Sequence, residues 1–502
     1  MVDQKNIQGD IWPRLPKKAE RFVFFRITKV QEFKKSLPTI ANFLTTSHSA
    51  LKTRNDIYKL KAEGKLKGLI NLVSLNIAFS ANGLAKLGAE RFNDEVFNGG
   101  QFKDMTAPSA GETAEDHQGL DPQGDWVPEF KPSSGGVDGV LVVAGDSLDS
   151  VDKMIQNTVD WAFNVGNDKQ SIEKVYTKTG TVYKNHLEHF GWADGISQPM
   201  IKGLDDVSVQ ENGAGMAPID PGIIIVGSEG DGSKHPEWAK DGSFMDGGLT
   251  VSISIRKSVV KKLTKHDTLG APMELHPKED PNYGLSQHED EEQNRIAVQA
   301  KFGQDGLDRL KTIKQKNETD AFNYNPADQT KCPYVSHMRK TGPRNDHPNY
   351  TKHVMMRRGI PYGPWCELKE RNGGVTQQER GLLFVSYQSS IDDGFRTQQK
   401  RWANAPDGPT DMAKHSGGHS QGIDPIIGQV HPNRINEDAD AQNRAKYRDP
   451  APQIHFPDTV YGEVGPQAYE KTIDLARLCI PHGGEYFFTP SISALKNYLP
   501  FV

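Results

Sequence analysis

One carboxylate occupies a setting that is unusual for a surface acid. Asp194 lies in the run HFGWADGISQP (189–199), where Gly191 and Gly195 flank it and a tryptophan precedes it by two residues. Glycine lets the backbone turn sharply or approach another group closely, so the run predicts a carboxylate held on a rigid loop. Taken alone, the GxxDG spacing is more often an ordinary turn.

A histidine with the character of a ligand lies further along the chain. His337 stands among small and apolar neighbours in CPYVSHMRKTGPR (332–344), and the basic residues Arg339, Lys340 and Arg344 follow it. Neutral imidazole is the commonest metal ligand in proteins, and arginines suit carboxylates and phosphates. The segment therefore predicts either a metal site beside an anion site or a structural histidine.

Two strand-like runs carry further candidate residues. The run VMMRRGIPYGP ends an apolar strand with Arg357 and Arg358, an awkward place for charge unless one guanidinium has a buried anionic partner. Because adjacent strand residues face opposite sides, only one of these arginines can point into a site. The run RGLLFVSYQSSI carries Leu382 and Phe384 on one face, which is also the pattern of ordinary core.

The elements that must position these residues repeat one order in both halves of the chain. In the first half, strand and helix patterns follow the order β-α-β, a gap, and β-α-β, which is the ferredoxin-like split unit. The second half shows the same theme, so the sequence predicts an α+β protein with two ferredoxin-like domains. The predicted strands are 21–28, 72–80, 137–145 and 171–180, then 249–257, 353–363, 381–388 and 483–490, with a helix over 389–404.

The junction between the two domains is expected in a run rich in Gly, Asp, Pro and Lys, at 228–243. This divides the chain into an N-terminal domain, 1–235, which carries the GxxDG loop, and a C-terminal domain, 236–502. Long polar stretches are too hydrophilic for core and predict surface loops. They cover 90–136, 264–296 and 404–450.

Composition excludes several classes of function. The 502 residues carry a net charge of -5, which argues against a general nucleic-acid binder, because such proteins have a basic surplus. No apolar run approaches the roughly 20 residues that span a bilayer, so no membrane partner is expected. The first residues lack the apolar centre of a signal peptide. The cysteines Cys332, Cys366 and Cys479 form no CxxC, which excludes a thiolate zinc site.

The order of the candidate segments along the chain is more informative than any one of them. GxxDG, then HMRKTGPR, then RRGIPYG, then GLLFVSYQ resembles the dye-decolorizing peroxidase family, in particular its fungal branch. The opening NIQGDI (6–11) and the phrase GIDPIIGQ (422–429) are similar to that family as well, so the resemblance covers nearly the whole chain. It implies ferredoxin-like domains of the dimeric α+β barrel type, with haem in the C-terminal domain.

The resemblance implies a peroxidase with one haem b, held non-covalently because the chain has no CxxCH attachment motif. His337 matches the proximal ligand of the iron, and Asp424 is the candidate carboxylate that fixes the tautomer of its ring. Asp194 and Arg357 match the distal pair. The acid moves a proton between the oxygens of hydrogen peroxide, and the guanidinium stabilises developing negative charge. An acid-side pH optimum follows, since a carboxylate beside a cation stays ionised at low pH.

The same resemblance assigns residues that line the cofactor pocket. Leu382 and Phe384 match apolar residues of the distal pocket. Gly195 and Ile196, in the GxxDG loop, are expected to contact the haem. Arg344 is expected to pair with a haem propionate, because arginine matches carboxylates with two hydrogen bonds.

The implied substrates are hydrogen peroxide together with dyes, phenols (including lignin-derived ones) and other aromatic small molecules. Because dyes are too bulky for a narrow haem channel, Trp402 and Tyr362 are expected to carry electrons as surface radical residues. Manganese(II) is left open as a further substrate, with Asp346 among the nearby acids. The resemblance implies an extracellular protein, with a cytoplasmic one as the alternative, and either a monomer or a homodimer.

Two other classes of protein fit part of the pattern. A haem carrier or storage protein of the same fold would bind haem with little turnover, and Asp194 and Arg357 would be dispensable. A structural pair of ferredoxin-like domains that binds nucleic acid or a small ligand would contain no haem, and the acidic charge and the lack of RNP-type aromatic strands argue against RNA. A haem absorption band and its response to peroxide separate the three classes.

Overall fold

The first half of the chain folds around four antiparallel strands in the order β4-β1-β3-β2, which is the ferredoxin-like order. Each strand coincides with a predicted one: β1 Ala19–Ile27, β2 Val73–Phe79, β3 Gly139–Gly145 and β4 Ile172–Thr181. The central strand β3, GVLVVAG, is buried along its whole length. It therefore appears in the sequence as a continuous apolar run rather than an alternating one.

The structure is a computed structural model, and the residues that it describes cover most of the first half and the strand and helix segments of the second. They are 2–65, 70–107, 126–183, 189, 197–205, 217–240, 244–246, 250–255, 323–324, 334, 336–365, 378–405, 408–409, 424, 426–428 and 479–502.

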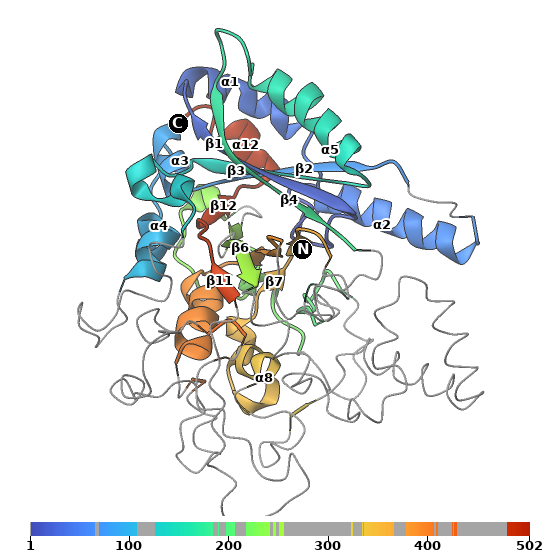
Figure 1. Cartoon of the computed structure of the whole chain (residues 1–502), viewed down its shortest axis with the longest axis vertical. Helices are drawn as coiled ribbons and strands as arrows, with labels where there is room; N and C mark the ends of the chain where they lie inside the picture. The colour runs from blue at the N-terminus through green and yellow to red at the C-terminus, as the bar shows by residue number, and fades with distance from the viewer. Residues whose placement is uncertain are drawn as a thin grey trace, which may run out of the picture.

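Local signals explain where the helices of the first half begin and end. Helix α3 (Ala81–Leu87) starts where the Ser80 side chain accepts the N–H of Gly83, and it stops at Gly88, whose φ of +79° suits glycine. Helix α5 (Leu148–Met154) starts with a reciprocal cap between Ser147 and Ser150 and continues as a π-helical segment, Ile155–Asp160. Figure 1 shows α5 and α1 (Val30–Ala41) on the same side of the sheet.

Aromatic side chains fill the space between these helices and the sheet. Phe33 of α1 stacks on Phe163 with ring centroids 5.0 Å apart, and Phe25 and Phe79 of the sheet meet Phe33 at 5.8 and 6.0 Å. All four rings are fully buried. Offset and edge-on aromatic pairs add to the hydrophobic stabilisation that burial supplies, so this cluster provides a rigid base for the first unit.

The second half repeats the ferredoxin-like order with strands that divide between two sheets. The runs 353–363 and 381–388, each predicted as one strand, are split: β7 and β10 join the large sheet, whereas β8 and β9 join a second, four-stranded sheet. Of the other four strands, β12 and β5 join the large sheet and β11 and β6 join the second. The second-half strands therefore run β12-β5-β10-β7 in the large sheet and β11-β6-β9-β8 in the other, the ferredoxin-like order in both. The prediction of undivided strands was wrong, because alternation reports which face is buried and not where a strand changes sheets. The strands are β5 Phe244–Asp246, β6 Thr250–Ile255, β7 Met356–Arg357, β8 Ile360–Tyr362, β9 Gly381–Phe384, β10 Ser386–Gln388, β11 Cys479–Pro481 and β12 Phe487–Thr489.

The two units share one eight-stranded sheet, in the order β4-β1-β3-β2-β12-β5-β10-β7. At the joint, β2 and β12 pair only through Phe79 and Phe488. The Gln8 side chain extends this joint, because its Nε2 donates to the carbonyls of Ile77 and Pro490 and its Oε1 accepts the N–H of Ile77. The predicted fold of two ferredoxin-like units is therefore confirmed, whereas the boundary between residues 235 and 236 stays a prediction.

Helix α4 (Glu95–Thr106) lies inside a stretch that the sequence predicts as a surface loop. Asp94 caps it by accepting the N–H groups of Val96 and Phe97, and Phe97 and Met105 are buried. The prediction of a loop over 90–136 was wrong here, because the mean polarity of the segment hides helical turns on either side of a kink at Gly100, which bury Phe97 and Met105. Among the described residues, no helix combines the length and the apolar character needed to cross a membrane.

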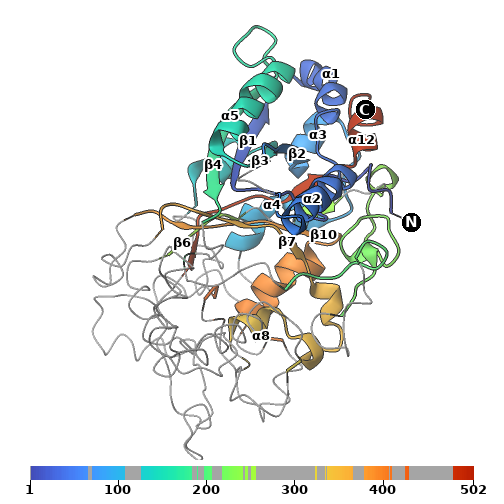
Figure 2. The same cartoon turned by 90° about the vertical axis from the view of Figure 1, so that its right-hand side faces the viewer.

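The remaining helices belong to both halves of the chain. Figure 2 shows α12 close to α1 and to the C-terminus, at the far end of the molecule from α8. Their bounds are α2 Ser47–Ala62, α8 His337–Thr341 and α12 Ile492–Asn497, with the π-helical segment η11 at Asp392–Ala403 and short 3-10 turns at Pro128–Phe130, Pro132–Ser134, Pro221–Ile223, Glu237–Ala239, Arg344–Asp346 and Tyr350–His353.

Candidate active site

A buried carboxylate lies behind the histidine that begins helix α8. Nδ1 of His337 is 2.8 Å from Oδ2 of Asp424, although the two residues are 87 positions apart in sequence. The other oxygen of Asp424 accepts the N–H groups of Ile426 and Ile427 at 2.8 and 2.9 Å. Burial alone would raise the pKa of Asp424, but His337 and the two N–H groups bring it below its usual value. The ionised carboxylate thus accepts the Nδ1 proton, which places the lone pair of a neutral ring on Nε2.

The two adjacent arginines after Met356 have opposite surroundings. Arg358 is buried, and its Nε and Nη2 donate to the carbonyls of Asp10 and Ile11 at 2.8 and 2.6 Å. Burial lowers the pKa of Arg358 to about 10, which leaves it charged at neutral pH. Its partners are backbone carbonyls of the N-terminal segment, so Arg358 has a structural role.

Arg357 is half-buried and turns to a different part of the chain. Its Nη2 donates to the carbonyl of Ser197 at 2.9 Å, and its backbone N–H donates to Oε1 of Gln198 at 3.0 Å. The alternation of the strand therefore separates the two guanidinium groups. Arg357 is the one that lies beside the segment following Asp194 in sequence.

The residues on either side of segment 190–196 both contact the β7–β8 region. Before the loop, Nε2 of His189 donates to the carbonyl of Tyr362 at 2.6 Å; burial lowers the pKa of His189 to about 4, so its ring is neutral. On the other side of segment 190–196, the carbonyl of Ser197 accepts a hydrogen bond from the guanidinium of Arg357. Residues 190–196, which include Asp194 and the predicted pocket residues Gly195 and Ile196, lie outside the described residues. Sequence reasoning missed both contacts, since no spacing rule marks a residue that contacts another segment's backbone.

Arg344 also reaches Ser197. It is buried, and its Nη2 lies 3.4 Å from the Ser197 hydroxyl. Its φ of +49° is uncommon for a residue other than glycine. The guanidinium groups of Arg344 and Arg357 therefore converge on one serine, Ser197.

Leu382 and Phe384 lie on one face of β9, as the sequence predicts. Both are half-buried, whereas Leu383 between them is buried. Phe384 meets Phe395 of η11 with ring centroids 6.0 Å apart, and Leu382 pairs with Pro361 of β8. The half-buried face of β9 is thus apolar and available to line a pocket.

Trp402 and Tyr362 do not lie at the surface. Trp402 is 5% exposed and Tyr362 is 3% exposed, so the expectation of surface positions was wrong. The ring of Trp402 is covered by His347 and His353, at centroid distances of 5.5 and 5.1 Å. The ring of Tyr362 is covered by the Lys178 ammonium, which lies 4.3 Å from its centroid. A helix pattern shows which side of a helix is apolar, but not which other segment covers it.

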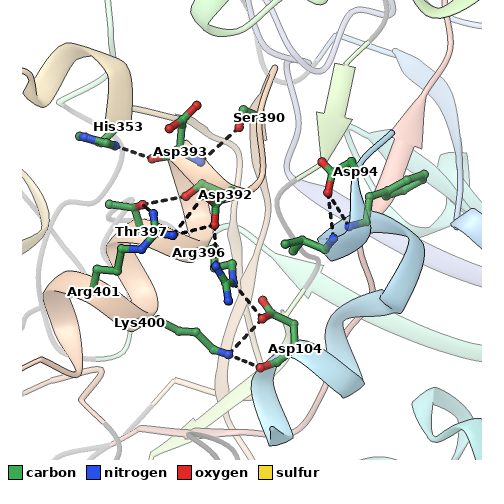
Figure 3. Close-up of polar contacts among 12 residues, drawn as sticks. Asp94, Asp104, His353, Ser390, Asp392, Asp393, Arg396, Thr397, Lys400 and Arg401 are labelled. Atoms are coloured by element: carbon green, nitrogen blue, oxygen red, sulfur yellow. Dashed lines mark hydrogen bonds and ion pairs between the residues drawn. The ribbon is translucent and has the colours of Figure 1, made fainter. Parts of the chain in front are cut away.

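The helix that carries Trp402 is fixed by ion pairs. Figure 3 shows Arg396 and Lys400 of η11 meeting Asp104 of α4, at 2.9 and 3.0 Å. Arg396 also pairs with Asp392 at 2.6 Å. Asp104 accepts the hydroxyl of buried Tyr486 at 2.7 Å as well. These contacts join the first unit to η11 and hold the helix in one position.

A manganese site finds no support in the described part of the chain. Asp346 is buried and accepts Nε of Arg339 at 2.6 Å, so it is committed to an internal ion pair. Among the described residues, no three His, Cys, Asp or Glu side chains come together as a metal site.

The chain combines two ferredoxin-like units, an imidazole backed by a buried carboxylate, and two arginines that converge on Ser197. This combination is that of a protein that binds a metal cofactor and an anion beside it. The chain matches two family descriptions, "DyP dimeric alpha+beta barrel domain" over residues 6–183 and "Dyp-type peroxidase, C-terminal" over residues 290–420. It is 30% identical to a dye-decolorizing peroxidase of Mycetinis scorodonius over 520 residues, which cover 98% of this chain and 87% of the relative.

Solved structures agree with this match. An ancestral D-type dye decolorizing peroxidase is 33% identical, with a TM-score of 0.72 over 99% of both chains. A dye-decolorizing peroxidase in complex with 2,6-dimethoxyphenol is 29% identical, with a TM-score of 0.69 over 100% of both chains. The chain therefore belongs to the dye-decolorizing peroxidase family, and the prediction of a haem enzyme that uses peroxide to oxidise dyes and other aromatic compounds is confirmed.

Proposed function

We propose that this peroxidase holds haem b without a covalent bond and that Nε2 of His337 would bind its iron. The observation that carries this proposal is the 2.8 Å contact between His337 Nδ1 and Asp424 Oδ2. The imidazole is 31% exposed while the carboxylate is fully buried, so the ring is the outward member of the pair. A histidine oriented by a buried carboxylate has the donor atom and the basicity that haem iron requires. When bound, the haem supplies an iron centre that peroxide oxidises and that single-electron donors restore.

Asp194 and Arg357 are the proposed acid–base and electrostatic residues for the reaction with peroxide. The carboxylate of Asp194 accepts a proton from the inner oxygen of peroxide and delivers it to the outer oxygen, so that water can leave. The guanidinium of Arg357 stabilises the negative charge that develops on the peroxide. The contacts of the flanking residues support this pairing, because His189 binds the carbonyl of Tyr362 and the carbonyl of Ser197 binds Arg357 itself.

The remaining pocket residues have supporting roles in this proposal. Arg344 binds a haem propionate, because a buried guanidinium can match a carboxylate with two hydrogen bonds. Leu382 and Phe384 form the apolar wall that limits water beside the reacting peroxide. Gly195 and Ile196 contact the haem through the loop.

Trp402 and Tyr362 are proposed to relay electrons from donors that are too large for the pocket. Both rings are buried, so a donor binds against the groups that cover them and does not touch the rings. These groups are His347 and His353 for Trp402 and Lys178 for Tyr362. Indole and phenol rings are the side chains most readily oxidised by one electron, which supports the relay.

The proposed donors are dyes and phenols, including compounds like the 2,6-dimethoxyphenol bound by a relative and phenols derived from lignin. Manganese(II) stays open as a further substrate, and the described residues offer no site for it. We further propose that the enzyme acts outside the cell, as a monomer or a homodimer.

The test replaces the two distal residues. Asp194→Asn and Arg357→Leu are expected to bind haem normally and to react with peroxide about 100- to 1000-fold more slowly, measured by stopped-flow absorbance at the Soret band. Arg21→Leu is the matched control, because Arg21 is a partly exposed arginine that pairs with Asp152 on the first unit. Parental rates in both distal variants would refute the assignment. Slow peroxide reaction in the parent protein would favour the haem carrier.

A further inference from the structure

We propose that residues 8–12 form a brace that sets the position of Arg357 against residues 197–205, with Asp10 and Trp12 as its positioning residues. The inference rests on the proposed function, because it takes Arg357 as the group that acts on peroxide. The brace contacts the strand that carries Arg357 on one side and the segment following the Asp194 loop on the other.

The first arm of the brace holds the strand side. Arg358, the neighbour of Arg357, donates to the carbonyls of Asp10 and Ile11. The hydroxyl of Tyr387 donates to Oδ2 of Asp10 at 2.9 Å. Tyr387 belongs to β10 and pairs with Met356 of β7, so both paired strands bind the same residue of the N-terminal segment.

The second arm holds the loop side. Nε1 of Trp12 donates to Oδ1 of Asp205 at 2.9 Å, and Oδ2 of Asp205 accepts the N–H of Ile201 at 2.8 Å. Trp12 is 4% exposed and Asp205 is half-buried, so this hydrogen bond is partly shielded from water. Residues 201–205 continue directly from Ser197, the acceptor for Arg357. The brace therefore determines where both partners of the Arg357–Ser197 contact lie.

The brace is itself held by strong buried contacts. Gln8 binds both the N–H and the carbonyl of Ile77 in β2, which ties the segment to the central sheet. Lys17 lies 3.9 Å from Asp10 and 2.6 Å from Glu20, and all three side chains are at most 2% exposed. Buried charges persist only when they are paired, so the segment has little freedom to shift. A rigid support matters here because misplacing a catalytic group by about 1 Å can slow a reaction about 100-fold.

Two conservative variants each release one arm. Trp12→Phe removes the bond to Asp205, and Tyr387→Phe removes the bond to Asp10. Each is expected to react with peroxide roughly tenfold more slowly, with normal haem content and an unchanged rate of reduction by a small phenol. Hydrogen exchange should accelerate at residues 197–205 in Trp12→Phe and at residues 354–360 in Tyr387→Phe, with or without haem.

Trp126→Phe is the matched control, because Trp126 is equally buried and its Nε1 has no hydrogen-bond partner in the described part of the chain. Asp205→Asn replaces Trp12→Phe as the test if Trp12→Phe folds poorly. If both single variants fold, the double variant should react with peroxide no more slowly than either one alone. Parental peroxide rates in Trp12→Phe and Tyr387→Phe, while Arg357→Leu is slow, would overturn the brace and leave the proposed function intact. An equal fall in the peroxide and phenol steps would also overturn it, since a general structural defect would slow both. A parental rate in Arg357→Leu would instead refute the proposed function.

Discussion

Replacing Asp424 with asparagine tests the proposed proximal site most directly. Asparagine keeps the size of the side chain but offers one acceptor and one donor in place of two acceptors. In the native protein, one oxygen faces His337 Nδ1 and the other faces the N–H groups of Ile426 and Ile427. Whichever way the amide turns, its NH₂ group faces a donor. The variant therefore loses either the bond to His337 or both backbone bonds.

The expected size of the effect follows from the loss of a charge-assisted hydrogen bond, which contributes about 1.5–3 kcal/mol. For a one-electron couple this corresponds to about 65–130 mV, and it is an upper bound because both oxidation states of the iron feel the same neighbour. The direction is upward, since a less electron-rich imidazole stabilises the ferric state less. Affinity for haem should fall by about 10- to 100-fold.

The assay is a spectroelectrochemical titration of the ferric/ferrous couple, together with a titration of the apoprotein with haem. Asp138→Asn is the control, because Asp138 is a buried carboxylate that binds the N–H of Ile27 and Lys86 in the first unit. Loss of the Asp138 carboxylate should lower the thermal stability of the protein without changing the potential of the ferric/ferrous couple. If Asp424→Asn retains the parental potential and haem affinity, His337 is not the ligand that Asp424 orients, and the reasoning fails.

The other predictions concern electron transfer and acid stability. Trp402→Phe should strongly reduce oxidation of bulky dyes while the reaction with peroxide stays nearly parental, with Trp161→Phe, at a residue 61% exposed, as the control; equal loss of both reactions would exclude a relay. Burial raises the pKa of Glu485 from 4.5 to about 7, against the opposing effect of the N–H groups of Gln101 and Tyr486. A raised pKa in the folded state stabilises the protein below about pH 4.5, and this contribution is lost as the pH rises through about 7. Glu485→Gln should flatten this part of the dependence of Tm on pH between 4 and 8, and an unchanged slope would contradict the assignment.

Much of the fold follows from rules that act over a few residues. The four strands of the first unit are apolar or alternating runs, and Ser80, Ser147 and Gly88 mark helix ends through contacts within their own turn. Such signals depend only on neighbouring residues, so one sequence suffices to find them. The order of motifs was enough to indicate the family. The choice of Arg357 over Arg358 rested on its register in the family motif, and strand alternation supported it only weakly.

Tertiary structure alone decided the rest. The division of each long strand between two sheets, the pairing of Arg358 with the N-terminal carbonyls, and the covering of Trp402 by His347 and His353 all join segments that are far apart in the chain. Burial of a side chain is a property of the segments that pack over it, and no local pattern encodes which segments those are. The sequence by itself therefore determined which chemical groups this protein has and which elements carry them, whereas long-range packing decided which of those groups meet.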